Sequence, residues 1–279
     1  MSLAYSFLLF RNPMRRALPA PLQETGTVFS DTLNKISTTV KGVRTIPVPI
    51  LTYHYIREIN AKQDPAGYRL SVSPVEFARQ LDALQQAGFK TVTPREFLAG
   101  KIDDQSIILS FDDGYRDFYE QVFPALTRRG LKAVIFVISG LLDDQEGRYM
   151  RSEQVTEIAR AGIEIGSHSV THTNLETIEG ADLQAELLES RFTLEKLVGD
   201  RVVSVAYPSG RYDDDTLRMA EFVGYRLGVT TESGVARLAD SHLTLPRINV
   251  RGGESAEDVL RKIELLKAGA TDSSSPSGE

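Results

Sequence analysis

Residues 107–114 read IILSFDDG, an apolar run rich in β-branched residues that ends in two aspartates and a glycine. An apolar run without polar alternation is typical of a strand that is buried on both faces, as in a parallel sheet covered by helices. In parallel α/β folds the catalytic side chains gather where such strands end. The stretch therefore predicts a parallel α/β fold with Asp112 and Asp113 at the edge that carries the chemistry. The alternative is a solvated Asp-Asp-Gly turn.

The rest of the chain repeats short apolar runs in alternation with amphipathic helical stretches, which indicates βα units. One predicted helix begins at Pro74 after the N-cap Ser73 and stops at Gly88, and another covers residues 182–198. Seven or eight such units in one chain favour a barrel. The predicted strands cover residues 48–53, 107–111, 133–138, 163–165, 202–205, 226–229 and 244–250.

The two ends of the chain lack this periodicity. We expect an N-terminal arm or leader over residues 1–45, one folded domain over 46–268 and a Ser-rich disordered tail over 269–279. The apolar run at residues 4–10 is too short to span a bilayer, and basic residues follow it instead of preceding it. No stable membrane insertion is expected, and the compartment stays open.

The composition excludes several classes of function. The chain has no cysteine, so disulfides, thiolate metal ligands and a cysteine nucleophile are ruled out. A net charge of −6 argues against nucleic acid as a partner, because neutralising phosphates needs clustered Lys and Arg. A neutral or partly cationic aminosugar polymer would not be repelled.

Two of the four histidines, His168 and His172, follow the predicted strand at 163–165 within the stretch GSHSVTHTN. Together with one aspartate of the pair at 112–113 they supply three ligands, the usual number in a catalytic zinc site with an open position for water. A bound cation would also relieve the repulsion between the adjacent carboxylates. It lowers the pKa of water toward about 7, which suits hydrolysis of amides or esters, and the second aspartate is free to act as base. Two ordinary loop histidines are the alternative.

Two further features follow predicted strands. The stretch AYPSGRY at 206–212 offers Tyr207 and Pro208 as a rigid wall for a sugar face, and backbone N–H groups that can face a developing oxyanion. Without a ligand it is a strand-ending turn. His54, in LTYHY at 51–55, is placed to protonate a leaving amine, although a lone histidine is more often structural.

The motifs SFDDG at 110–114 and SHSVTH at 167–172 resemble the first two motifs of the polysaccharide deacetylase family, carbohydrate esterase family four, over about residues 45–265. The resemblance implies a distorted (β/α) barrel of about seven strands that removes N-acetyl groups from an acetylated glycan. It implies Asp113, His168 and His172 as ligands of one divalent metal ion, zinc first and cobalt, nickel or iron as alternatives. Asp112 would be the general base. Such substrates favour the cell envelope or the exterior.

The chain departs from the family pattern in three places. Residues 207–210 resemble the third motif, with the Ser209 N–H in the oxyanion role, but Ala206 stands where the family has an arginine that orients the base. Arg247 is the candidate replacement. Ser209 also replaces the usual aromatic at the end of that motif. No clear C-terminal Leu-x-His motif is present, and the pair Tyr53–His54 resembles a circularly permuted subset, which makes His54 the expected general acid.

The same motifs leave three other functions open. An esterase that removes O-acetyl groups from xylan would use an identical metal site. Related barrels act on small-molecule amides. A carbohydrate-binding protein that has lost catalysis would fit the missing third-motif arginine. The oligomeric state is not indicated by the sequence.

Overall fold

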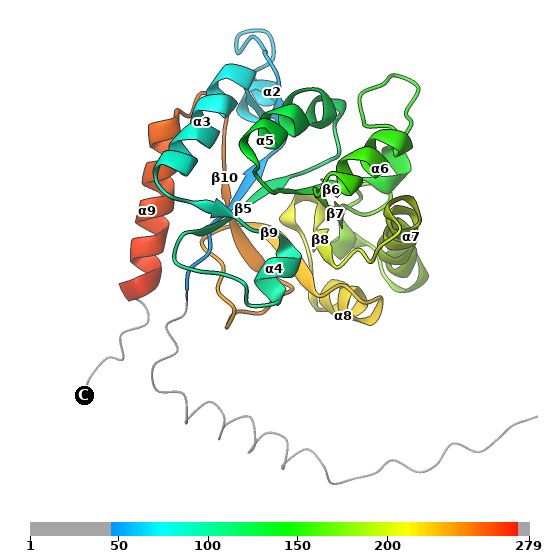
Figure 1. The fold of residues 1–279 in the computed structure, drawn as a ribbon. Coiled ribbons are helices and arrows are strands. Elements are labelled where there is room, and N and C mark those ends of the chain that lie inside the picture. The colour runs from blue at the N-terminus through cyan, green and yellow to red at the C-terminus, as the bar shows by residue number, and fades with distance from the viewer. Residues whose placement is uncertain (1–45, 273–279) are drawn as a thin grey trace, which may run out of the picture. The chain divides into compact units, whose positions relative to one another are not determined.

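The computed structural model describes residues 46–272, and its core is a closed barrel of parallel strands surrounded by helices (Figure 1). β1 pairs with β10 on one side and with β5 on the other, where Leu51 lies opposite Leu109, so the ring closes. In order of pairing the strands are β1 (Ile50–Tyr53), β10 (Leu245–Asn249), β9 (Leu227–Ser233), β8 (Ser204–Ala206), β7 (Glu164–Ser167), β6 (Val134–Val137) and β5 (Ser106–Phe111). The predicted barrel with seven strands is confirmed.

Helices connect most consecutive strands and cover the outside of the barrel (Figure 1). The longer ones are α3 (Pro74–Gln86), α5 (Phe123–Arg129), α6 (Ser152–Arg160), α7 (Gly180–Val198), α8 (Asp214–Phe222) and α9 (Ala256–Asp272). The short elements are β2 (Tyr55–Ile56), α2 (Pro65–Arg69), β3 (Ser71–Val72), β4 (Lys90–Thr91), α4 (Pro94–Leu98), η1 (Phe118–Val122), η2 (Ser139–Leu141), η3 (Leu175–Thr177) and η4 (Pro208–Gly210).

Local sequence explains where the predicted helices begin and end. The Ser73 side chain accepts a hydrogen bond from the N–H of Glu76, Pro74 occupies the first turn of α3, and Gly88 follows with a φ of 84°. α7 ends at Gly199, whose φ of 71° lies in the left-handed region that glycine adopts without strain. Both helices therefore match the predicted ones closely.

The apolar core is divided by the barrel wall. One cluster fills the interior and includes Ile50, Ile108, Phe136 and Leu227, while a larger one lies between the strands and the helices. Because successive strand residues face opposite sides, both faces of each barrel strand are buried, which is why the strands read as continuous apolar runs. Phe97 of α4 belongs to the interior cluster, so this short helix packs against the barrel filling.

The ends of the chain differ from expectation at one point. α9 continues to Asp272, past residue 268, where we expected the domain to end and a tail to begin. The Arg237 guanidinium donates a hydrogen bond to the carbonyl oxygen of Ala270, which holds the last turn of this helix against the domain. The predicted arm at 1–45 and residues 273–279 lie outside the described residues.

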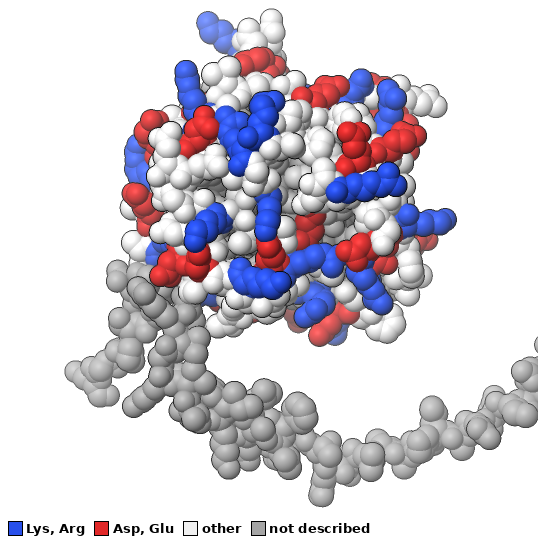
Figure 2. Space-filling model, viewed as in Figure 1, with Lys and Arg blue, Asp and Glu red and all other residues white. Residues whose placement is uncertain are grey.

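The described surface carries charges of both signs. On the face drawn in Figure 2, basic and acidic side chains are interspersed, without a continuous basic area on that face. Within residues 46–272, no helix combines the length and the apolar character that crossing a bilayer requires.

Candidate active site

Three side chains that are distant in the sequence converge at the carboxyl ends of β5 and β7. Asp113 Oδ1 lies 3.4 Å from Nε2 of His168 and 3.5 Å from Nε2 of His172. The candidate ligand atoms of the three residues all lie within 4.8 Å of one another. The structure thus brings together the residues that the two motifs predicted as a metal site.

The donor set fits a divalent cation. His168 Nδ1 lies 2.7 Å from the carbonyl oxygen of Ala206, and because a carbonyl only accepts, Nδ1 carries the proton. Nε2 of His168 is then left with its lone pair directed at Asp113. A histidine that is oriented in this way by a backbone carbonyl is the usual arrangement in protein metal sites. Two imidazoles and one carboxylate are the ligand types of a catalytic zinc site.

Several residues around this cluster adopt left-handed backbone conformations. Asp113 has a φ of 75°, Ser169 of 61°, His172 of 64° and Ser209 of 57°. A non-glycine residue in this region costs about 1–3 kcal/mol and persists only where the surroundings enforce it. Such strain collects at functional sites, and here it falls on two of the three candidate ligands.

Hydrogen bonds from α7 hold the histidine loop in place. Glu186 of α7 accepts from the N–H of Val170 at 2.9 Å, from the N–H of Thr171 at 3.0 Å and from the Thr171 hydroxyl at 2.7 Å. Inside the loop, Ser169 Oγ accepts from the N–H of His172 at 3.0 Å. The sequence analysis missed Glu186, because one more glutamate on an amphipathic helix gives no signal.

Asp112 lies beside the cluster and is held by Arg247. The guanidinium donates from Nη1 to Oδ1 at 2.8 Å and from Nη2 to Oδ2 at 2.7 Å, while its Nε donates to the carbonyl oxygen of Thr230 at 2.8 Å. Arg247 is fully buried and Asp112 nearly so. Burial alone would raise the pKa of Asp112, but Arg247 outweighs it and holds that pKa well below its usual value. Arg247, the predicted replacement for the missing third-motif arginine, is thus in contact with Asp112.

The three candidate ligands influence one another electrostatically. For Asp113, burial raises the pKa, but the neighbouring His168 more than offsets it and the pKa is lowered. For His168, burial opposes the charged form, yet the neighbouring carboxylates raise its pKa. Burial and the nearby His168 lower the pKa of His172. The three groups form one coupled cluster.

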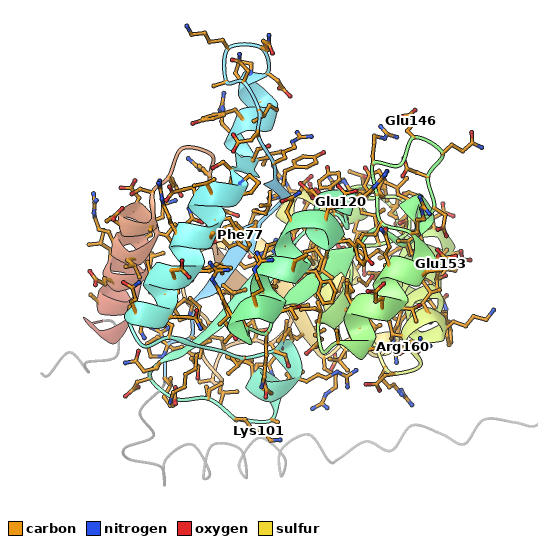
Figure 3. All side chains as sticks on the ribbon, turned by 45° about the horizontal axis from the view of Figure 1, so that its top comes forward. Phe77, Lys101, Glu120, Glu146, Glu153 and Arg160 are labelled. Carbon is orange, nitrogen blue, oxygen red and sulfur yellow. The ribbon has the colours of Figure 1, made fainter. Side chains whose placement is uncertain are left out.

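An open cleft of about 490 Å³ lies over these side chains. On the same side of the barrel, helix α2 and the loop that carries Glu146 project beyond the strand ends (Figures 1 and 3). Arg247 lies behind Asp112, and Pro208 is buried in η4. The cleft is lined by His54, Leu70, Asp112, Asp113, Tyr115, Ile138, Leu141, Tyr149, His168, Thr171, His172, Tyr207, Ser209, Gly210 and Thr231.

Tyr207 is among the residues that line the cleft, but its ring does not form the predicted exposed wall. Its side chain is 0% exposed, because the ring packs into the core so closely that a Cβ at Gly228 would lie 2.6 Å from its hydroxyl oxygen. Tyr115 and Tyr149 line the cleft, with ring centroids 5.2 Å apart, and Tyr55 stacks on Tyr115 with centroids 3.7 Å apart. Single tyrosines on three separate segments gave no motif in the sequence.

Comparison with known proteins agrees with this architecture. The family model described as polysaccharide deacetylase matches residues 99–228. One relative, named as the polysaccharide deacetylase YxkH of Bacillus subtilis, is 32% identical over 233 residues. The match covers 82% of this chain and 80% of that protein. The poly-β-1,6-N-acetyl-D-glucosamine N-deacetylase of Staphylococcus aureus is 25% identical over 224 residues, 71% of this chain and 77% of the other.

A solved structure shows the same fold at similar identity. The Streptococcus pyogenes deacetylase PplD, in complex with acetate, superposes with a TM-score of 0.73 at 31% identity, and the match covers 78% of this chain and 98% of PplD. The likeness to a circularly permuted subset stays a prediction. The barrel, the two motifs and a relative matched over four fifths of its length agree, so the chain belongs to the polysaccharide deacetylase family.

Proposed function

We propose that this protein is a metal-dependent hydrolase that removes N-acetyl groups from an acetylated aminosugar polymer or oligosaccharide. The observation that carries the proposal is the convergence of Asp113, His168 and His172 in an open cleft, with Asp112, paired with Arg247, beside them. Three ligands with an exposed side are the arrangement of a catalytic site, whereas a structural zinc site is closed by four protein ligands.

Asp113, His168 and His172 would hold one divalent cation, and zinc suits this donor set best. When bound, such a cation supplies Lewis acidity, which acidifies water toward a pKa of about 7 and polarises an acetyl carbonyl. The remaining work falls to side chains of the chain itself.

Asp112 is the proposed general base, which takes the proton of the attacking water. Arg247 keeps it ionised and fixes its orientation through two parallel hydrogen bonds. The N–H of Ser209 would donate to the oxyanion that forms when the acetyl carbon becomes tetrahedral. His54, which also lines the cleft, would protonate the departing sugar nitrogen, so that acetate and a free amine leave.

Two relatives support this choice of substrate. The S. aureus relatives are named as N-deacetylases of poly-β-1,6-N-acetyl-D-glucosamine, and acetate, the expected product, is bound in the PplD structure. An open cleft also admits a chain that continues beyond the reacting sugar.

The test is acetate release from a small panel of substrates by purified protein after chelation and after metal add-back. The panel contains β-1,6- and β-1,4-linked N-acetylglucosamine oligomers, acetylated xylan and a simple N-alkyl acetamide. We expect release from the N-acetylglucosamine oligomers that is lost on chelation, is restored by Zn²⁺ and is absent in Asp112→Asn. Release from acetylated xylan alone would identify an O-acetyl esterase. Activity on the simple acetamide alone would identify a small-molecule amidase, and oligomer binding without turnover a carbohydrate-binding protein.

A further inference from the structure

A second groove, of about 460 Å³, lies next to the active-site cleft. Thr231 of β9 lines both hollows, so they adjoin at this residue. The other walls of the groove come from the carboxyl ends of β9 and β10, from the turn after β10, and from the middle of α9. No residue of the proposed reaction centre lines it.

The topology of the barrel leaves this groove open. Residues 234–244, which join β9 to β10 and are all among the described residues, contain no helix. α9 packs against α3. The strand next to β10 on this side of the barrel is β1. At the junction with the cleft, Gly210 has a φ of 70°, and a Cβ there would lie 2.1 Å from Oγ1 of Thr231. Only a glycine permits this close approach, so η4 packs tightly against β9 at the residue that lines both hollows.

The groove presents a fixed polar frame. Lys262 of α9 forms an ion pair with Glu254 and donates a hydrogen bond to the carbonyl oxygen of Asn249 at 3.0 Å. The Asn249 amide donates to the carbonyl oxygen of Thr231 at 3.4 Å, and its side-chain oxygen remains available as an acceptor in a residue that lines the groove. These contacts hold the polar groups in position before any ligand arrives.

Two other side chains are free to contact a ligand. Arg251 is exposed, and its guanidinium has no ion-pair partner among residues 46–272. Leu265 is 66% exposed and contributes apolar surface. A sugar ring matches this combination, because it offers hydroxyl and acetamide oxygens at its edge and C–H groups on its faces. A lone guanidinium donates hydrogen bonds to such neutral oxygens, whereas it repels the ammonium group of a deacetylated unit.

We propose that this groove is a glycan subsite, which binds still-acetylated sugar residues of the same chain next to the residue that is deacetylated. The proposal rests on the proposed function, and it takes the groove, which adjoins the cleft at Thr231, as an extension of the cleft. It assigns Arg251, Asn249 and Leu265 to substrate binding and gives them no part in the chemical step. The protein then prefers oligomers to single sugars.

The test compares N-acetylglucosamine oligomers of one to five units, in the linkage that the substrate panel identifies. Acetate release gives kcat and KM for the wild type, Arg251→Ala and Leu265→Ser. Arg261→Ala is the matched control, because Arg261 is an exposed arginine on the same helix as Leu265 that does not line the groove. The variants alter exposed side chains, so folding should be unaffected, and circular dichroism checks this.

We expect Arg251→Ala to raise KM for the pentamer about tenfold, the size of one charge-assisted hydrogen bond, with kcat and the kinetics of the shortest substrate unchanged. Leu265→Ser should act in the same direction and Arg261→Ala should have no effect. Equal kinetics of all variants on the pentamer, or equal losses on every chain length, would overturn the subsite. If wild-type protein releases no acetate from any oligomer, the proposed function fails instead.

Discussion

Replacing Arg247 by methionine tests how the buried base is kept ionised. Methionine fills much of the same volume but removes the two hydrogen bonds to Asp112 and the one to Thr230. Breaking a buried pair by removing one partner costs about 3–5 kcal/mol of unfolding free energy, because the other charge is left without compensation. We expect a loss in this range for Arg247→Met.

The same change should move the pH dependence of catalysis. In the wild type, Arg247 holds the pKa of Asp112 well below its usual value, so the base stays ionised far into the acid range. Without the guanidinium, burial acts unopposed and raises that pKa. The acid limb of kcat/KM should shift to higher pH, and kcat at pH 7 should fall by about 10²–10⁴, the usual contribution of a general base.

The assay combines two measurements on five proteins. Acetate release as a function of pH is compared between the wild type, Arg247→Met and Arg247→Lys, since lysine keeps the charge but loses the paired geometry. Urea unfolding of Asp112→Asn, Arg247→Met and the double variant closes a double-mutant cycle. We expect the double variant to lose clearly less stability than the sum of the single ones. An unchanged pH profile in Arg247→Met, together with a coupling energy below about 0.5 kcal/mol, would refute the reasoning.

Three further predictions concern groups around the site. Glu186→Gln should weaken Zn²⁺ binding about 10- to 100-fold, because the histidine loop loses its anchor, and Glu189→Gln on the same helix should not; competition with a metal-binding dye measures both. Burial raises the pKa of Asp117 to about 6 from 3.8, so the folded state favours the neutral carboxyl. The stabilisation from this neutral carboxyl is fully present below about pH 4 and is lost as the pH rises through 6. Asp117→Asn should therefore raise the unfolding free energy at pH 8 by up to about 3 kcal/mol and give no gain at pH 4, and a gain that is equal at both pH values would contradict this. The Tyr207 hydroxyl is buried without a hydrogen-bond partner among the described residues, so Tyr207→Phe should leave the stability unchanged or raise it and should not change KM for the oligomers; a raised KM would show that the hydroxyl contacts the sugar.

Much of the fold was readable from the sequence because of how the barrel buries its strands. β5 and β6 are covered on both faces, so they appear as uninterrupted apolar runs. β4 was missed, since Lys90 and Thr91 form only two pairs at the start of β5 and need no apolar pattern. The end of α9 was misplaced because its last turn is held by Arg237, a residue far away in the chain.

The site shows the same division between local and long-range signals. Asp113, His168 and His172 were predicted because both motifs follow strands, and parallel strands end at one edge of the barrel. Arg247 was found because Ala206 stands where the third motif has its arginine, and a late predicted strand carries an arginine that could replace it. Tyr207 was misjudged, since the sequence does not show whether an aromatic ring faces the cleft or the core.

The central claim is that two imidazoles and one carboxylate hold a catalytic cation, and a calorimetric titration of metal-free protein with Zn²⁺ tests it most directly. The account predicts one tight site per chain in the wild type, which is lost in Asp113→Ala and in His168→Ala and kept in Arg261→Ala. Wild-type protein that binds no Zn²⁺, or that binds it equally well without Asp113 and His168, would contradict the account.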